Sequence, residues 1–412
     1  MLTPEYFQTG VHRATRDSYL MPKRAAGRLD KIGDLLKDQL SSITPKETPG
    51  HPPPIPTESE FQNPQLNLFQ EFIHNKEEER DHLSNAIDLW DNIPRYTFSR
   101  QAMNKARRND TTLKKYTSTC QYRGRTYTCT ISPARVQDLD GEERDYYPSA
   151  NEELVEDALR KLAANQQSGF FDKPNYRSGV VFSLYELREE LKSRGHARSY
   201  QEVRLALDIM SSAIIEITSH DHDKGEVLVR SPYLPSVVAV SRSRLKDDPR
   251  AKWAVQFHPF VTGSIDKVTY RQFNYHLMMS HNTQLARWLH KQLVLKYTFA
   301  EPTKPFEMRY TTIKRDSGLL NGYTRERAAI AALDTAFDDL QKCRVLLSYE
   351  RRDVAGPRNK LLDVIFKIWP SFDFVRETKA ANKRITLGQQ KNSVGLGGGS
   401  PANLLGPTGK SR

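Results

Sequence analysis

Cysteine is scarce in this chain of 412 residues. Cys120, Cys129 and Cys343 form no Cys-x-x-Cys pair and offer no disulfide framework, so we expect free thiols in a reducing compartment. No stretch approaches the ~18 apolar residues that a membrane-spanning helix needs. Residues 1–19 also lack the apolar core of a secretion signal. The sequence therefore predicts a soluble, cytoplasmic protein that does not enter a membrane.

Hydrophobic residues are also few, at 37% of the chain, although its length is enough for two or three domains. We expect a folded part together with long polar segments. Lys and Arg outnumber Asp and Glu, which gives a formal net charge of +12 and favours an anionic partner, nucleic acid before a membrane surface. Seven Lys or Arg and one acid lie from residue 376 onward, which predicts a basic tail.

Sequence signatures of catalysis are missing. The run Gly406–Ser411 ends like a phosphate-binding loop, but Leu404 stands where the first glycine belongs and no helix can follow. His220 and His222 flank an aspartate, where metal-binding His-x-His motifs of nickases have an apolar residue. No Ser/His/Asp or Cys/His arrangement stands out. We therefore expect no enzyme activity, no cofactor and no metal.

The N-terminal region contains a short apolar cluster in polar surroundings. Residues 1–60 are expected to be mostly disordered, with a short helix at 24–40 and a Pro-rich spacer at 45–56. Residues 61–111 are expected to form a linker, and the stable fold to begin near Thr112. Within the linker, Gln65-Leu66-Asn67-Leu68-Phe69 resembles the Gln-Leu-x-Leu-Phe motif with which bacterial replication proteins bind the sliding clamp. The alternative is the edge of an amphipathic helix that packs on its own domain.

Two similar series of elements follow. A β-hairpin at 116–131 precedes a helix at 151–166, a strand at 179–182, and two helices opened by the capping boxes Ser183–Glu186 and Ser199–Glu202. The apolar spacing extends the second of these helices to Ile217, and strands are expected at 227–230, 236–240 and 253–257.

The second series consists of a helix at 283–297, a strand at 307–310, a short helix from Thr311, a long helix at 324–343, and two strands at 345–349 and 361–368. The order helix, strand, helix, helix, ribbon thus occurs twice, which is the order of a winged helix. The sequence predicts an α+β protein with two tandem winged-helix domains, at 112–266 and 267–375, and a disordered basic tail at 376–412.

Basic residues concentrate where such domains meet DNA. In a helix-turn-helix, the second helix enters the major groove by its N-terminal residues. Cations at a helix N-terminus oppose the helix dipole, which makes sense if a phosphate or a guanine edge is the partner, although a solvated helix end is the alternative for any single residue. The basic loop of the second ribbon suits a wing on the DNA backbone, whereas the mixed charge of the first ribbon's turn suggests few DNA contacts there. The candidate DNA-binding residues are Arg194, His196, Arg198, Arg204, Lys314, Arg315, Arg325, Arg327, Arg351, Arg352, Arg358 and Lys360.

Three features together resemble the plasmid replication initiators of the TrfA type, the tandem winged-helix Rep family. They are the pentapeptide at 65–69, the stretch from Val181 to Ile217, and the stretch from Ala286 to Leu347. The resemblance implies a bacterial protein that binds direct repeats (iterons) in double-stranded DNA at a plasmid origin, after which an adjacent AT-rich segment melts. It also implies recruitment of the host initiator, the replicative helicase and the sliding clamp, and dimers through the first domain that limit copy number.

Two other functions fit parts of the sequence. A winged-helix transcriptional repressor explains the basic helix ends but has no use for a clamp-binding segment. A nickase or relaxase requires metal-dependent strand cleavage, for which the histidine pair and the nucleophile context are missing.

Overall fold

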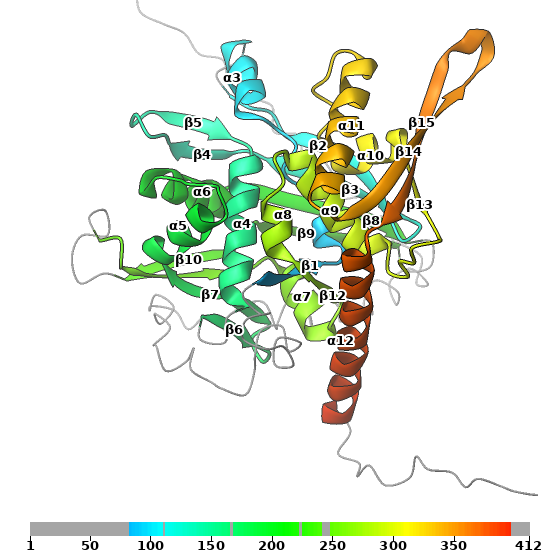
Figure 1. The fold of residues 1–412 in the computed structure, drawn as a ribbon. Helices are drawn as coiled ribbons and strands as arrows, with labels where there is room; N and C mark the ends of the chain where they lie inside the picture. Colours follow the sequence, from blue (N-terminus) through cyan, green and yellow to red (C-terminus); the bar gives the residue numbers. More distant parts are fainter. Residues whose placement is uncertain (1–81, 110–111, 165–167, 222–224, 241–247, 397–412) are drawn as a thin grey trace, which may run out of the picture. The chain divides into compact units, whose positions relative to one another are not determined.

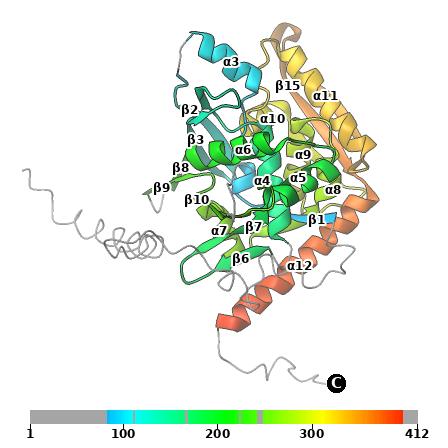
Figure 2. The ribbon, with the colours of Figure 1, turned by 90° about the vertical axis from the view of Figure 1, so that its left-hand side faces the viewer.

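The computed structural model of the protein describes residues 82–109, 112–164, 168–221, 225–240 and 248–396. Contacts divide the chain into two units, Met1–Pro52 and Pro53–Arg412, and all described residues belong to the second. The described residues form helices and antiparallel sheets (Figures 1 and 2), which confirms the α+β class. No described helix combines the length and the apolar character that a membrane crossing requires. The predicted disorder at 1–60 and the pentapeptide at 65–69 lie outside the described residues.

The fold begins earlier than the sequence predicts. Strand β1 (Leu83–Ile87) pairs with β12 (Tyr270–Asn274), and Ala86 and Ile87 are fully buried. A 3-10 turn, η2 (Trp90–Asn92), and helix α3 (Arg100–Asn109) follow. The prediction of a linker up to residue 111 is therefore wrong for residues 83–109. A strand whose partner lies far along the chain leaves no local signal that distinguishes it from an extended linker.

A four-stranded sheet includes the predicted hairpin. Strands β2 (Tyr116–Tyr122) and β3 (Arg125–Ser132) pair antiparallel, and Arg123 and Gly124 between them both have positive φ, 48° and 76°. Two such residues give the tight turn whose twist matches that of the strands. Strands β8 (Ile214–Asp221) and β9 (Gly225–Pro232) continue the sheet, in the order β2-β3-β8-β9.

The first predicted series of elements is present. It comprises α4 (Ala150–Ala163), β7 (Arg177–Ser183), α5 (Leu184–Ser193) and α6 (Tyr200–Ser212), and the structure adds β6 (Gly169–Asp172), which the sequence does not predict. Both capping boxes form, with the hydroxyl oxygens of Ser183 and Ser199 accepting backbone N–H groups of Glu186 and Glu202 at 3.1 and 3.2 Å. The predicted end of α6 at Ile217 is wrong, because residues 214–217 form part of β8. Their β-branched side chains favour a strand that alternates between buried and half-buried positions.

Several shorter elements complete the part of the fold that precedes the second series. Strands β10 and β11 confirm the predicted strands at 236–240 and 253–257, and they join β7 and β6 in the order β10-β11-β7-β6. The elements are β4 (Ala134–Gln137), β5 (Glu143–Tyr146), β10 (Ser236–Val240), β11 (Lys252–Gln256), α7 (Pro259–Lys267) and α8 (Tyr275–Met279).

The second series is also present, in the predicted order. It consists of α9 (Gln284–Lys296), β13 (Phe306–Arg309), α10 (Tyr310–Ser317), α11 (Glu326–Lys342), β14 (Leu346–Ala355) and β15 (Leu361–Pro370). The three strands form one sheet in the order β13-β15-β14. Leu333, Phe337 and Leu340 of α11 are fully buried, and the Phe337 ring stacks on Phe366 of β15 with ring centroids 4.6 Å apart. These side chains, three or four positions apart, form the face of the helix that packs on the core.

The two series differ in where their ribbons lie. In the second, the β14–β15 ribbon pairs with β13, the strand that precedes α10. In the first, the β8–β9 ribbon pairs with β3, while β7, the strand that precedes α5, pairs with β11 and β6. The β8–β9 ribbon is thus part of a larger sheet, whereas the β14–β15 ribbon projects away from the other elements of the second series (Figure 1).

The basic tail begins as a helix and not as a disordered segment. Helix α12 (Phe372–Leu396) packs against β12 and buries Phe374, Val375 and Ala381. Asn382 accepts a hydrogen bond from Arg271 at 2.6 Å and donates one to the Thr298 carbonyl at 2.8 Å. The prediction of disorder from residue 376 is wrong up to residue 396, because apolar side chains here are few and alanines supply part of the buried face. Residues 397–412 lie outside the described part.

Candidate nucleic-acid interface

The N-terminal end of α11 presents arginines to solvent. Helix α10 ends at Gly318, whose φ of +65° is the left-handed conformation that glycine adopts without strain. After the turn, Arg325 is the N-cap residue of α11 and Arg327 lies in its first turn, and both side chains are exposed. No ion pair to either arginine is found among the described residues. The first turn of a helix also exposes backbone N–H groups, so this helix end offers backbone donors as well as two exposed guanidinium groups.

The end of α10 lies beside this tip. Lys314 reaches Glu326, the first residue of α11, with Nζ 3.7 Å from the carboxylate oxygen. Arg315 is paired with its neighbour Asp316 at 2.7 Å. Both cations therefore have an acidic neighbour, and Lys314 lies beside the first turn of α11.

The β14–β15 ribbon ends in a second basic group. At its tip the Gly356 N–H donates to the Lys360 carbonyl at 2.7 Å, and Arg358 adopts a left-handed conformation with φ of 58°. Arg352, Arg358 and Lys360 are exposed, and within the described part of the chain they have no ion-pair partner. Arg351 differs, because Asp334 and Asp353 hold its guanidinium at 3.0 and 2.9 Å. It braces the ribbon against α11.

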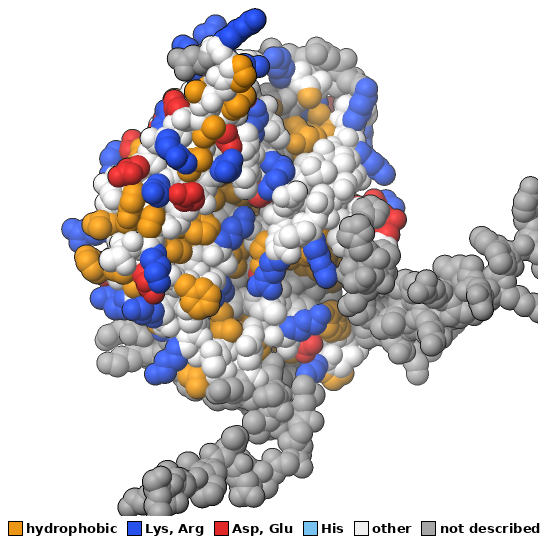
Figure 3. All heavy atoms as spheres, turned by 90° about the vertical axis from the view of Figure 1, so that its right-hand side faces the viewer, with side chains coloured by type: hydrophobic (Ala, Val, Ile, Leu, Met, Phe, Trp, Pro, Cys, Tyr) orange, Lys and Arg blue, Asp and Glu red, His pale blue; other side chains and the backbone are white. Residues whose placement is uncertain are grey.

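That brace places the helix tip and the ribbon tip at the same end. The chain runs from 326 to 342 in α11 and returns along it in β14, where Tyr349 donates to Asp338 at 2.7 Å and Arg351 pairs with Asp334. From this contact, about 10 Å of helix leads back to Arg327 and about 13 Å of strand leads on to residue 355, at ~1.5 and ~3.3 Å per residue. Figure 1 shows both tips at the top. Figure 3, which faces the side on which the β14–β15 ribbon lies, shows Lys and Arg side chains at the top of the molecule.

Two of the candidate DNA-binding residues in the turn before α6, Arg194 and His196, are engaged with protein. The Arg194 side chain is only 7% exposed, pairs with Glu190 at 3.0 Å and contacts the His276 ring on α8. His196 lies with Nε2 2.7 Å from the Met279 carbonyl oxygen, and burial lowers its pKa. Both residues dock α5 and α6 on α8.

Arg198 and Arg204 are half-buried. Arg198 donates from Nε to the Asn151 side chain at 2.6 Å, and Arg204 lies one turn before Asp208 on α6. Arg198 is therefore engaged with protein, and Arg204 is less exposed than Arg325 and Arg327. The first helix pair thus supplies a weaker basic end than the second.

Helix α3, which lies in the segment that the sequence predicts to be a linker, is an additional basic element. Fully buried Met103 anchors it, and Arg100 pairs with Glu152 of α4 at 3.2 Å. Arg107 lies over the Tyr146 ring at 4.6 Å, and Lys105 is exposed. Figures 1 and 2 place α3 at the same end as the α11 tip. The basic run at 105–108 was the available signal.

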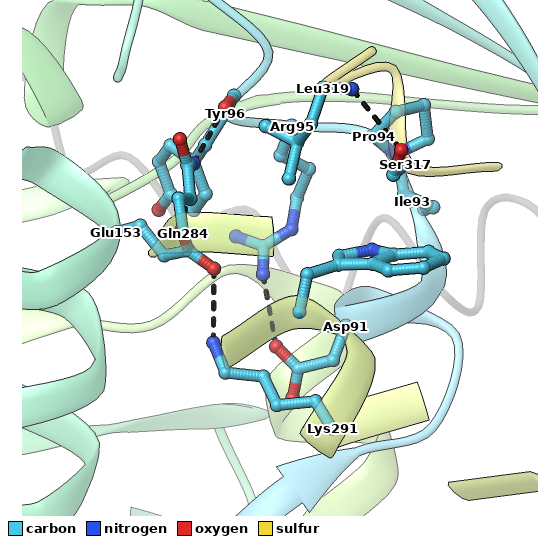
Figure 4. A pocket seen from close by; sticks show the side chains of 11 residues that line it. Asp91, Ile93, Pro94, Arg95, Tyr96, Glu153, Gln284, Lys291, Ser317 and Leu319 are labelled. Atoms are coloured by element: carbon cyan, nitrogen blue, oxygen red, sulfur yellow. Dashed lines mark hydrogen bonds and ion pairs between the residues drawn. The ribbon is translucent and has the colours of Figure 1, made fainter. Parts of the chain in front are cut away.

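A buried ionic cluster joins the two series of elements. Asp91 contacts Arg160 of α4 at 2.7 Å and Arg95 at 3.1 Å, and Arg95 pairs with Glu156 at 2.6 Å. Lys291 of α9 reaches Asp157 at 2.7 Å and Glu153 at 3.2 Å, and Figure 4 shows part of this cluster lining a small pocket. The cluster consists of Asp91, Arg95, Glu153, Glu156, Asp157, Arg160 and Lys291.

Burial and pairing oppose each other within this cluster. Burial by itself would raise the pKa of Glu156, but the charges of Arg95 and Arg160 outweigh it and hold that pKa below its ordinary value. For Asp157 burial prevails, and its pKa is raised. Burial would lower the pKa of Lys291, but Asp157 and Glu153 raise it. The cluster therefore ties α9 to α4 through charges that depend on one another.

Comparisons with known proteins found no matching family model and no matching curated protein. Among solved structures, domains 2 and 3 of RctB resemble this chain at 11% identity and a TM-score of 0.40, covering 63% of it and 92% of that structure. A second structure of RctB domains 2–3 gives 9%, 0.38, 66% and 96%. The Pi initiator protein in complex with iteron DNA gives 11%, 0.31, 71% and 99%. Since these likenesses are weak in sequence and in shape, we base the function on the chain's own residues.

Proposed function

We propose that this protein binds double-stranded DNA through the second series of elements, acting as a winged helix. Helix α11 would enter the major groove with Arg325 and Arg327 at its tip, and the β14–β15 ribbon would follow the backbone with Arg352, Arg358 and Lys360. The observation that carries the proposal is that these five exposed cations, free of acidic partners among the described residues, extend from two adjacent tips at one end of the domain.

The first series would have a different task. Its ribbon is part of a four-stranded sheet, and its turn residues Arg194 and His196 dock on α8. We propose that it orients the second winged helix, contributes backbone contacts through Arg198 and Arg204, and offers a surface for protein contacts, including those of a homodimer. Lys314 and Arg315 would add phosphate contacts beside the α11 tip.

The chain as a whole is proposed to be a plasmid replication initiator. It would bind direct repeats at an origin and promote melting of an adjacent AT-rich segment, driven by binding energy and DNA distortion and without catalysis by the protein. The segment Gln65–Phe69 would bind the sliding clamp, and other surfaces the host helicase. A winged-helix repressor is the alternative, and it requires no clamp contact.

Footprinting on the DNA that flanks the gene tests the DNA-binding part. Protected tandem repeats of about two helical turns beside an AT-rich block support an initiator, and a single protected operator that overlaps a promoter supports a repressor. If no segment of that DNA is protected, both the initiator and the repressor are contradicted.

A clamp pull-down tests the initiator part separately. Replacing Leu68 and Phe69 together by Ala should abolish capture of a bacterial sliding clamp and leave duplex binding unchanged. Replacing Gln62 and Gln70, which flank the motif, by Ala is the matched control and should retain capture. Equal capture by the Leu68/Phe69 variant and the wild type would remove the clamp from the proposal.

A further inference from the structure

Three residues with metal-binding side chains meet where α11 ends against the turn between α8 and α9. His281 follows α8, Asp339 lies in the last turn of α11, and Cys343 is the C-cap residue of that helix. One ligand atom of each residue lies within 4.8 Å of the others. Asp339 and Cys343 are four residues apart, which puts them on the same side of the helix end. None of the three belongs to the proposed DNA interface.

His281 points an unpartnered nitrogen into this cluster. The residue is 1% exposed, and its Nδ1 has no hydrogen-bond partner. That atom lies 3.7 Å from Oδ2 of Asp339, which is too long for a hydrogen bond. A buried imidazole nitrogen left unpaired beside a carboxylate costs free energy unless a cation lies between them.

The surroundings hold these side chains as a metal site requires. His281 Nε2 is 3.0 Å from His290 Nδ1, so it can donate there and leave the Nδ1 lone pair directed at the cluster. Metal-binding histidines typically make such a bond with their second nitrogen. The Asp339 carboxylate accepts the Asn282 backbone N–H at 2.8 Å and its side-chain N–H at 2.9 Å, which fixes its orientation.

We propose that His281 Nδ1, Asp339 Oδ2 and Cys343 Sγ bind one zinc ion. Nitrogen, sulfur and carboxylate oxygen are the ligands that zinc prefers, and a tetrahedral ion holds its ligand atoms about 3.3–3.7 Å apart. The fourth position would face Ser280, which is exposed and whose Oγ is 3.8 Å from Cys343 Sγ, so water can complete the shell. Thiolate and carboxylate together balance the charge of the ion. This revises the sequence-based expectation of no metal.

The site would fix the C-terminal end of α11 to the α8–α9 turn. The opposite end of α11 is the tip with Arg325 and Arg327, so zinc would stabilise the helix without touching DNA. The inference does not depend on the proposed function, because metal binding is measured without nucleic acid.

Cobalt provides the direct test, because Co²⁺ replaces zinc and reports its ligands by absorption. The full-length protein, reduced and stripped of metal, is titrated with Co²⁺. We expect one equivalent to bind with a thiolate-to-cobalt band in the near ultraviolet and intense visible bands of four-coordinate cobalt, and Zn²⁺ to abolish both. Cys343→Ala should lose the thiolate band, and Asp339→Asn should weaken binding at least tenfold. Cys120→Ala is the matched control, since Cys120 is buried in β2, and it should keep the band.

A second measurement uses the wild type alone. Cys343 is the only one of the three thiols that is not fully buried, so it should be the first to react with a thiol reagent. Zinc should slow that reaction at least tenfold, and a chelator should restore it. Absence of a thiolate band in the wild type, its persistence in Cys343→Ala, or an unchanged thiol reaction with zinc would overturn the proposal.

Discussion

Lys291 offers a sharp test of how the two series of elements are held together. Its ammonium group, from α9, is buried between Asp157 and Glu153 of α4 at 2.7 and 3.2 Å. Lys291→Met keeps most of the side-chain volume and removes the charge. The cluster then holds four carboxylates against two guanidinium groups. Removing one partner of a buried ion pair typically costs about 3–5 kcal/mol, so we expect a loss of that size in the free energy of unfolding at pH 7.

The loss of stability should depend on pH, because protonation of a carboxylate in the variant removes part of the unbalanced negative charge. The pKa of Asp157 is already raised by burial, and loss of Lys291 raises it further. A carboxyl group whose folded pKa exceeds its unfolded value binds its proton more tightly in the folded state, so its effect on stability becomes less favourable as pH rises. The variant should therefore be closest to the wild type near pH 5 and furthest from it near pH 8. Lys291 itself has a raised pKa, so in the wild type its contribution is lost only above the ordinary lysine pKa.

Urea unfolding followed by tryptophan fluorescence and circular dichroism measures the effect. Lys304→Met is the matched control, because Lys304 is 73% exposed and pairs with Glu301 at 2.9 Å on the surface. An exposed pair of this kind contributes about 0–1 kcal/mol. If Lys291→Met lost no more than this control at pH 7, or lost more at pH 5 than at pH 8, the cluster would not have the role described here.

Three further predictions rest on single features. Gly318→Ala should lower the free energy of unfolding by at least about 1 kcal/mol, because φ is +65° and a Cβ would meet the Thr97 side chain at 2.5 Å. Gly322→Ala is the control, since nothing lies within 4 Å of a Cβ there, and equal unfolding midpoints of the two variants would contradict this prediction. Lys360→Ala should reduce the slope of log affinity against log salt by about 1, measured by anisotropy with duplex DNA, and an unchanged slope would remove this residue from the backbone contacts. Burial, with the Arg95 charge, lowers the pKa of His258 to about 3. The unfolded chain therefore gains this proton first, and stability should fall as pH drops below about 6.5. His258→Gln should make that fall less steep in acid unfolding curves, and an equally steep fall would show that His258 does not cause it.

Local signals in the sequence predicted local structure well. The capping boxes before α5 and α6, the hairpin at 116–131 and the long helix at 324–343 are all present, because each depends on residues a few positions apart. Strand β1 was not predicted because its partner β12 lies far along the chain, and helix α12 was not predicted because few of its side chains are apolar. The end of α6 was misplaced because residues 214–217 satisfy helical spacing and strand propensity at once.

In the candidate DNA interface, too, features that depend on nearby residues could be predicted and features that depend on distant residues could not. The exposed positions of Arg325 and Arg327 could be predicted from the helix boundary alone. The docking of Arg194 on α8 and the buried partners of Lys291 depend on side chains brought together by the fold, which no spacing rule contains. For the same reason, the approach of His281 to Asp339 and Cys343 had no signal in the sequence.

The most direct test of the central claim is the affinity of the Arg325→Ala/Arg327→Ala variant for the footprinted duplex. We expect a loss of about 1–3 kcal/mol in binding free energy for each arginine that meets a base edge, with an unchanged fold. Arg376→Ala, on α12 and 78% exposed, is the matched control and should bind like the wild type. Equal affinity of the double variant and the control would show that α11 does not enter the groove.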